Sequence, residues 1–237
     1  MQNDLSGILL ADKPKGCTSH DVVDHVRNHF RIESVGHCGT LDPMATGLLV
    51  LLLGKATKLS DRLIGEDKEY EGTLTLGVTT DSQDADGRLL SEKSVSPFSE
   101  EEIHAIFQTF QGDLLQIPPM VSAKKVAGIP LYKLARKGKE IERKPRLIHV
   151  CRMDILRIHL PDVDFRLLCT KGTYVRTICH DIGEKLGCGG HLSRLRRTAS
   201  GRFRLDRAYS LPEIKSWNHL QLQKNLISPF DTLYPSA

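Results

Sequence analysis

The segment of this chain with the clearest capacity for chemistry is residues 36–47, which read Gly-His-Cys-Gly-Thr-Leu-Asp-Pro-Met-Ala-Thr-Gly. Its three glycines permit positive φ angles and close backbone approach, which a loop built around a ligand requires. Pro43 restrains Asp42 to extended geometry, so this carboxylate lies on irregular chain just before the apolar run 48–53. The arrangement suits a reactive carboxylate. An ordinary Asp-Pro turn is the alternative, and the residues alone leave both open.

Two further patterns could bind metal ions. Cys17 and His20 are three residues apart, as are Cys188 and His191, and these half-sites would bind zinc only if they met in space. Residues 81–87 carry acids at loop positions 1, 4 and 6. They lack the acid at position 3 and the glycine at position 6 of an EF-hand, so a solvated hairpin loop is the better interpretation.

The charge of the chain is unevenly distributed along its 237 residues, although the net charge is only +4. Residues 66–113 have a net charge of −9, whereas residues 124–157 carry +8 and residues 166–207 carry +7. Such segregation indicates a polyanionic partner, most often nucleic acid. Solvated faces that happen to cluster are the alternative interpretation.

Several protein classes are excluded by composition and by the N-terminus. The longest apolar run, residues 48–53, is far shorter than the roughly 20 residues that span a bilayer. The N-terminus has neither the basic nor the apolar region of a secretory signal. None of the six cysteines forms a C-x-x-C pair, so we expect reduced thiols in a cytoplasmic protein.

Hydrophobic periodicity predicts the elements that must position these residues. Residues 34–47 are rich in Gly, Ser, Thr and Pro and are expected to be irregular, and residues 118–146 are expected to be a basic excursion from the core. Strands and helices mix without regular β-α-β alternation, which predicts the α+β class with a largely antiparallel sheet. The expected strands are 7–11, 48–53, 70–78, 147–158, 163–170 and 202–209, and the expected helices are 19–30, 56–64, 99–111, 174–186 and 212–217.

Residues 36–48 resemble the catalytic motif of the TruB family of tRNA pseudouridine synthases, which has Gly-Thr-Leu-Asp-Pro followed by Ala-Thr-Gly. Five motifs in the same order over nearly the whole chain distinguish this resemblance from chance. The resemblance implies the pseudouridine synthase fold, in which helices and loops flank a mixed, mainly antiparallel sheet. The four other matching motifs are residues 10–16 with Thr18 and Ser19, residues 68–70, residues 170–178 with 181–183, and residues 195–197.

The activity implied by this resemblance is isomerisation of uridine 55 in the T loop of tRNA to pseudouridine. The base is detached at N1 and rejoined through C5 without net redox change or hydrolysis, so neither a metal nor another cofactor is expected. By analogy Asp42 is the nucleophile, and Arg176 is the cation that keeps its carboxylate ionised and oriented. Attack on C6 of the base, attack on C1′ of the ribose and assistance of a glycal route all stay open.

The resemblance also implies residues that bind the substrate, because a uridine in a folded loop must be extruded before its glycosidic bond can be reached. Tyr70 matches the tyrosine that stacks on the flipped base and lies near it during turnover. His37 matches a residue that inserts into the T loop in place of flipped bases. Tyr174 and Leu195 match residues lining the uridine pocket, and Lys13 matches part of a supporting turn beneath the catalytic loop.

The expected domain organisation is one catalytic domain over residues 1–233, followed by a tail of residues 234–237. Residues 118–146 match the family's basic insertion that closes over the T-stem loop of tRNA. Many relatives carry an additional RNA-binding domain of the PUA type, which we do not expect here, so binding should depend on the catalytic face and the insertion. Cys38 stands where the family more often has Thr. We expect a monomer with tRNA as its partner and no association with membranes.

Two alternative functions come from other classes. A non-catalytic RNA chaperone or binding module could have kept the fold and lost the chemistry, but it would not need the Asp42, Tyr70 and Arg176 set. A phosphate-transferring enzyme is disfavoured because the chain has no G-x-x-x-x-G-K-[ST] loop.

Overall fold

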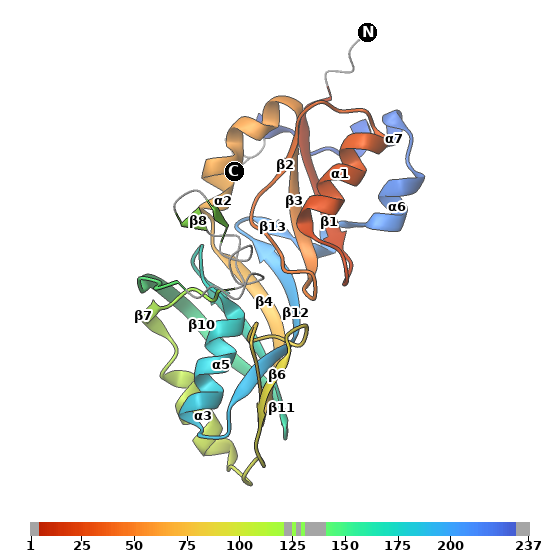
Figure 1. The fold of residues 1–237 in the computed structure, drawn as a ribbon. Helices are drawn as coiled ribbons and strands as arrows, with labels where there is room; N and C mark the ends of the chain where they lie inside the picture. Colours follow the sequence, from red (N-terminus) through yellow and green to blue (C-terminus); the bar gives the residue numbers. More distant parts are fainter. Residues whose placement is uncertain (1–4, 121–124, 127–128, 131–140, 231–237) are drawn as a thin grey trace. The chain divides into compact units, whose positions relative to one another are not determined.

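A computed structural model describes residues 5–120, 125–126, 129–130 and 141–230, and the chain divides into two compact units (Figure 1). The first unit comprises Met1–Tyr70 and Arg196–Ala237, and the second comprises Glu71–Leu195. The chain passes from the first unit to the second within strand β4 (Lys68–Leu76) and returns within strand β12 (Gly190–Ser200). Most of the predicted basic insertion lies outside the described residues.

Each unit combines strands and helices. The other elements of the first unit are β1 (Gly7–Lys13), α1 (Ser19–His29), β2 (Val35–His37), β3 (Thr46–Leu53), the 3₁₀ helix η1 (Gly54–Leu59), α2 (Ser60–Ile64), β13 (Phe203–Arg204), η2 (Leu205–Arg207), β14 (Tyr209–Ser210), α6 (Leu211–Ser216) and α7 (His219–Asn225). Those of the second unit are β5 (Val78–Thr80), β6 (Leu89–Glu92), α3 (Glu100–Gln108), β7 (Gly112–Gln116), β8 (Lys125–Val126), β9 (Ile129–Pro130), β10 (Arg146–His159), β11 (Asp162–Cys169) and α5 (Val175–Lys185).

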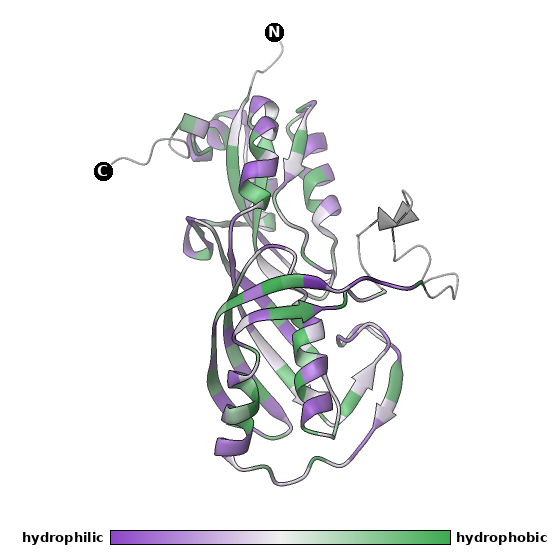
Figure 2. Cartoon of the chain, turned by 90° about the vertical axis from the view of Figure 1, so that its left-hand side faces the viewer, coloured by the Kyte–Doolittle hydropathy of each residue, from purple (hydrophilic) through white to green (hydrophobic). Residues whose placement is uncertain are grey.

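The core of the first unit is built on the antiparallel pair β1 and β3, which runs in register from Gly7 opposite Leu53 to Lys13 opposite Gly47. Alternate residues of both strands pack against α1, α6 and α7, and the residues between them pack against η1, α2 and β13. Both faces of β3 are therefore buried, which explains why residues 48–53 are apolar without alternation. The surrounding helices carry both hydrophobic and hydrophilic residues (Figure 2).

Two helices begin at caps that the sequence encodes. The Thr18 hydroxyl accepts a hydrogen bond from the Asp21 N–H at 3.1 Å, and the Asp21 carboxylate accepts one from the Thr18 N–H at 2.7 Å. Ser99 and Glu102 form the same reciprocal pair at the start of α3. These pairs satisfy N–H groups that have no partner inside the helix, so the predicted starts of both helices are confirmed.

The sheet of the second unit is mainly antiparallel, since β10 pairs antiparallel with both β11 and β7. Buried side chains of α3 and of the sheet share a core in which the Phe107 and Phe165 rings lie 6.4 Å apart. In the first unit β1–β3, β2–β3 and β12–β13 are antiparallel, whereas β1–β14 and β12–β3 are parallel. The predicted α+β class with a mixed, mainly antiparallel sheet is confirmed.

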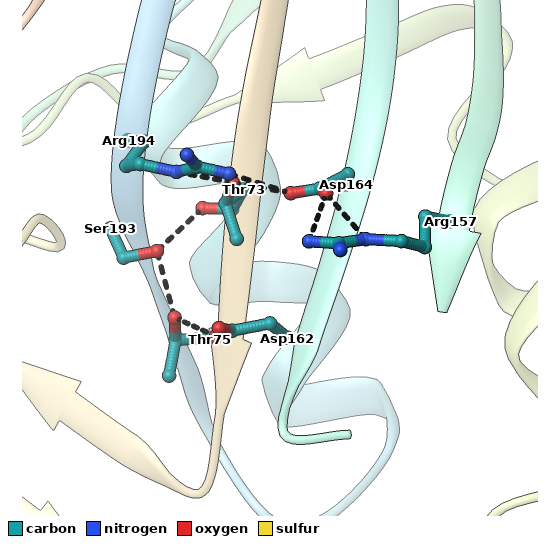
Figure 3. Close-up of polar contacts among 7 residues, drawn as sticks. All are labelled: Thr73, Thr75, Arg157, Asp162, Asp164, Ser193 and Arg194. Atoms are coloured by element: carbon teal, nitrogen blue, oxygen red, sulfur yellow. Dashed lines mark hydrogen bonds and ion pairs between the residues drawn. The ribbon is translucent and has the colours of Figure 1, made fainter. Parts of the chain in front are cut away.

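A polar network crosses β4, β10, β11 and β12 in the second unit (Figure 3). Asp164 is its centre: its carboxylate accepts hydrogen bonds from Thr73 Oγ1 at 2.6 Å, Arg157 Nε at 3.0 Å and Arg194 Nη2 at 3.2 Å. Thr75 Oγ1 lies 2.6 Å from Asp162 Oδ1. Partial burial alone would raise the pKa of Asp164, but the hydrogen bonds from Thr73 and Arg157 and the nearby arginine charges hold it below its usual value.

We expect Asp164→Asn to lower the free energy of unfolding by about 1.5–3 kcal/mol at pH 7, the range for hydrogen bonds to a charged group. A depressed pKa stabilises the fold at pH values above the unfolded pKa of about 4, and this contribution is lost as the pH falls further. Urea unfolding at pH 7 and pH 3 measures the effect. As a matched control, Asp154→Asn removes a carboxylate from a partly exposed pair with Arg152 and should change stability by less than about 1 kcal/mol. An equal loss at both pH values would contradict this prediction.

Three expectations about the elements are wrong. Strand β12 is not predicted from the sequence, because arginines interrupt its apolar alternation. The acidic residues that pair with these arginines lie next to them only in the folded chain. The strand expected at 202–209 is two short strands, β13 and β14, separated by η2. Residues 34–47 are not wholly irregular, because β2 pairs with β3.

No helix in the described part of the chain is long and apolar enough to cross a membrane.

Candidate active site

Asp42 lies half-buried on a turn between β2 and β3, in a segment we call the Asp42 loop (residues 38–45). Inside the turn, the Ala45 N–H donates to the Asp42 carbonyl at 3.1 Å. Before it, the Leu41 N–H donates to the Ser19 hydroxyl at 2.8 Å, and this hydroxyl lies 3.1 Å from the Leu41 carbonyl. Ser19 is buried at the start of α1. Helix α1 therefore fixes the backbone next to Asp42.

Lys13 lies at the end of β1 with its side chain completely buried. Its Nζ donates to the carbonyls of Cys17 at 2.7 Å, Pro14 at 3.0 Å and Pro43 at 3.3 Å, which matches the three donors of an ammonium group. Burial lowers the pKa of Lys13, and the neighbouring Cys17 thiol and Asp42 carboxylate act in the opposite direction. Lys13 thus holds the residue after Asp42 and places a cation within electrostatic range of its carboxylate.

His37 and Tyr70 complete the set of predicted residues in the first unit. His37 is the last residue of β2, and its Nδ1 has no hydrogen-bond partner among the described residues. Burial, and after it the charge of Arg197, lowers the pKa of His37, so the neutral imidazole predominates at neutral pH. Tyr70 is buried in β4, two residues after Lys68, whose Nζ donates to the Ile64 carbonyl at 2.7 Å.

Arg176 is buried in the first turn of α5, in the second unit. Its Nη1 lies 3.3 Å from Asp84 Oδ2, and the side chains of Arg176 and Asp84 are only 4% and 5% exposed. The other carboxylate oxygen of Asp84 accepts from Ser82 Oγ at 2.5 Å and from the Asp86 N–H at 3.2 Å. The guanidinium is therefore oriented by a buried acid that the sequence analysis did not assign to the site.

Asp84 belongs to the Asp84 loop (residues 81–87), which connects β5 and β6 as a hairpin. The expectation that this loop is solvated is wrong at its centre. The Ala85 N–H donates to the Leu192 carbonyl at 3.0 Å, and Thr177 Oγ1 donates to Gln83 Oε1 at 2.7 Å. These contacts dock the loop on β12 and α5, which removes Asp84 from water. The acids at positions 1, 4 and 6 were the only sequence signal of this loop.

Tyr174 is the residue that precedes α5, and its ring lies 5.7 Å from Arg176 Cζ. Both backbone polar groups of Tyr174 are bound by one buried side chain, that of Gln116. Gln116 Nε2 donates to the Tyr174 carbonyl at 3.0 Å, and Gln116 Oε1 accepts from the Tyr174 N–H at 2.8 Å. Gln116 therefore fixes the start of α5, a role that its position at the end of β7 did not suggest. Leu195 is buried in β12.

The predicted site residues are thus divided between the two units. Lys13, His37, Asp42 and Tyr70 lie in the first, and Tyr174, Arg176 and Leu195 lie in the second. The pairing of Asp42 with Arg176 stays a prediction. In the described part of the chain, no group of three or more His, Cys, Asp or Glu residues is arranged to hold a metal ion.

Comparison with known families covers almost the whole chain. A family model described as "TruB family pseudouridylate synthase (N terminal domain)" matches residues 27–175. The chain belongs to the TruB family. A second model, "tRNA pseudouridylate synthase B C-terminal domain", matches residues 176–234 of this TruB-family chain. The chain is accordingly a pseudouridylate synthase, an isomerase.

Individual proteins give the same assignment. A "tRNA pseudouridine synthase B" from Opitutus terrae is 56% identical over 95% of this chain and 94% of its own length. One from Syntrophotalea carbinolica is 45% identical over 98% of this chain and 76% of its own. Among solved structures, a Cbf5-Nop10-Gar1 complex contains a chain that superimposes with a TM-score of 0.72 at 30% identity. That match covers 93% of this TruB-family chain, which spans 56% of the length of the solved chain.

Proposed function

We propose that this enzyme isomerises uridine 55 in the T loop of tRNA to pseudouridine. The relatives named tRNA pseudouridine synthase B support tRNA as the substrate. The observation that carries the proposal is the Asp42 loop, in which a half-buried carboxylate lies on backbone held by Ser19 and by the Lys13 ammonium. A nucleophile must be held in one geometry before the substrate arrives, and this arrangement meets that requirement.

The proposed chemistry needs a nucleophile, a cation and a way to hold an extruded base. Asp42 attacks the nucleoside, the bond from C1′ to N1 breaks, and C1′ is rejoined to C5 of the base. The bond to Asp42 then breaks, C5 loses its proton and N1 takes one up, which leaves pseudouridine and the free carboxylate. Arg176, which Asp84 orients, supplies the cation beside the carboxylate. Tyr70 stacks on the flipped uracil, and Tyr174 and Leu195 line the pocket that receives it.

His37 is proposed to occupy the space that the flipped bases leave in the T loop. A neutral imidazole suits this role, because a planar uncharged ring stacks between bases with little cost of desolvation. The lowered pKa of His37 and its partly unsatisfied ring among the described residues support this assignment.

Affinity for tRNA is proposed to come from phosphate contacts to the basic segments 118–146 and 166–207. The chain then acts as a monomer whose catalytic domain, residues 1–233, binds the T-stem loop through its catalytic face and the insertion. An isolated T-arm hairpin should bind nearly as tightly as whole tRNA, within about tenfold. A filter-binding comparison in one buffer measures this, and much tighter binding of whole tRNA would contradict it.

The position of the modified uridine tests the proposed function directly. Transcribed tRNA is incubated with the enzyme, and pseudouridine is mapped by carbodiimide modification and primer extension. We expect one stop at position 55 and none in a matched tRNA with cytidine there. Pseudouridine at another position alone would overturn the proposed substrate site. Tight binding without any pseudouridine would favour the non-catalytic RNA-binding module.

A further inference from the structure

Arg197 is one of the largest fully buried side chains among the described residues, with 1% of its surface exposed. It lies in the first unit, near the end of β12. No carboxylate in the described residues forms an ion pair with it. Its guanidinium instead donates to three backbone carbonyls: Nε to Leu48 at 2.7 Å, Nη2 to Gly39 at 3.0 Å and Nη1 to Thr40 at 3.5 Å. A buried cation without an acidic partner is unfavourable unless carbonyls solvate it, so these contacts are necessary.

The three carbonyls lie on both sides of Asp42 in the sequence. Gly39 and Thr40 precede Asp42 within the Asp42 loop, and Leu48 follows it in β3. The Arg197 guanidinium therefore links the start of the Asp42 loop to β3, the strand that follows the loop. Lys13 and Ser19 act on the middle of the loop, at Pro43 and Leu41. The contacts of Arg197 are thus separate from those of Lys13 and Ser19.

The backbone of Arg197 also contacts the loop exit. Arg197 lies opposite Gly47 in the parallel pairing of β12 with β3. Gly47 has a φ of +100°, and a Cβ at this position would lie 2.4 Å from the Arg197 carbonyl oxygen. Such close packing leaves space only for glycine. The side chain and backbone of Arg197 therefore hold both ends of the Asp42 loop.

The titratable groups next to Arg197 include a thiol and a second buried cation. Burial raises the pKa of the Cys38 thiol to about 11, although Lys68 and Arg197 act against this, so the thiol is neutral. Burial and then the charge of Arg197 lower the pKa of Lys68, which is another buried cation. Arg197 is therefore buried near another cation, and its three carbonyl contacts offset the cost of burying its charge.

We propose that Arg197 is a positioning residue for pseudouridine formation, because its guanidinium holds the Asp42 loop in the geometry that presents the Asp42 carboxylate to the nucleoside. This inference rests on the proposed role of Asp42. A lysine ammonium can donate to several carbonyls only where they converge on one nitrogen, as they do around Lys13, whereas the Arg197 guanidinium donates from three separate nitrogens. The geometry of the fork, and not its charge alone, is what the loop requires.

The test compares Arg197→Met, Arg197→Lys and wild type in the full-length enzyme. Single-turnover pseudouridine formation is measured at saturating tRNA, the Kd for tRNA is measured by filter binding, and folding is checked by thermal melting. We expect Arg197→Met to lower the rate by about 10²-fold, the size of effect that small misplacements of reacting groups produce. The Kd of Arg197→Met for tRNA should stay within about threefold of the wild-type value. Arg197→Lys should also lose at least about tenfold in rate. Lys215→Met removes an exposed cation from α6 and serves as the control.

Each outcome decides the proposal. A folded Arg197→Met enzyme with a rate within about threefold of wild type would overturn it, as would equal losses in rate and in binding. Full recovery by Arg197→Lys would show that charge suffices and would overturn the role of the fork. If Arg197→Met does not fold, the rate of folded Arg197→Lys decides. Wild-type activity that survives Asp42→Asn would instead overturn the proposed function.

Discussion

Replacing Asp42 with asparagine is expected to reduce pseudouridine formation in transcribed tRNA by at least about 10³-fold, the scale on which loss of a nucleophile acts. Asparagine has nearly the same shape as aspartate and leaves the backbone contacts of Ser19 and Lys13 in place. The folded enzyme should therefore keep its affinity for tRNA within a fewfold. The measurement is single-turnover conversion at saturating enzyme, together with Kd from filter binding.

Asp61→Asn provides the matched control for this substitution, because Asp61 is an exposed carboxylate in α2 of the same unit. It should leave both rate and Kd unchanged. Residual turnover of Asp42→Asn near that of wild type would remove Asp42 from the mechanism. Lost turnover with retained binding would separate a catalyst from a non-catalytic RNA-binding module, since such a module gains nothing from the carboxylate.

Asp84→Asn is expected to lower the rate by about 10²-fold, because it removes the buried charge that orients the Arg176 guanidinium. An oriented cation contributes most where charge develops during the reaction, and loss of one such interaction typically has an effect of this size. The same change removes the negative charge from the buried pair of Asp84 with Arg176, which is destabilising by about 3–5 kcal/mol. Thermal melting and single-turnover rates on the same samples separate the two effects.

The control for Asp84 lies in the same loop. Asp86 is exposed, and its backbone N–H, not its side chain, binds Asp84, so Asp86→Asn should preserve both rate and stability. An Asp84→Asn enzyme that melts at a lower temperature but turns over at the wild-type rate below its melting point would limit Asp84 to a structural role. Arg176→Lys combined with Asp84→Asn tests whether the two residues act together, because the losses should then not add.

Much of the local structure follows from neighbouring residues. Thr18 with Asp21 and Ser99 with Glu102 encode the starts of α1 and α3, because each cap is completed within four residues of chain. The apolar run in β3 indicates a strand buried on both faces for the same reason of local pattern. Elements whose stability depends on distant partners could not be found in this way. Strand β12 is the main case, since Arg194 pairs with Asp164 and Arg196 with Asp12.

For the candidate site, the sequence by itself determined which residues are proposed to carry the chemistry. Asp42 was recognised on its loop, and Arg176 through the order of the family motifs. The tertiary structure alone decided how these side chains are held. Asp84 is 92 residues from Arg176 and Arg197 is 149 residues from Leu48. No local pattern records such pairings, because a buried charge acquires its hydrogen-bond partners only when distant segments pack together and exclude water.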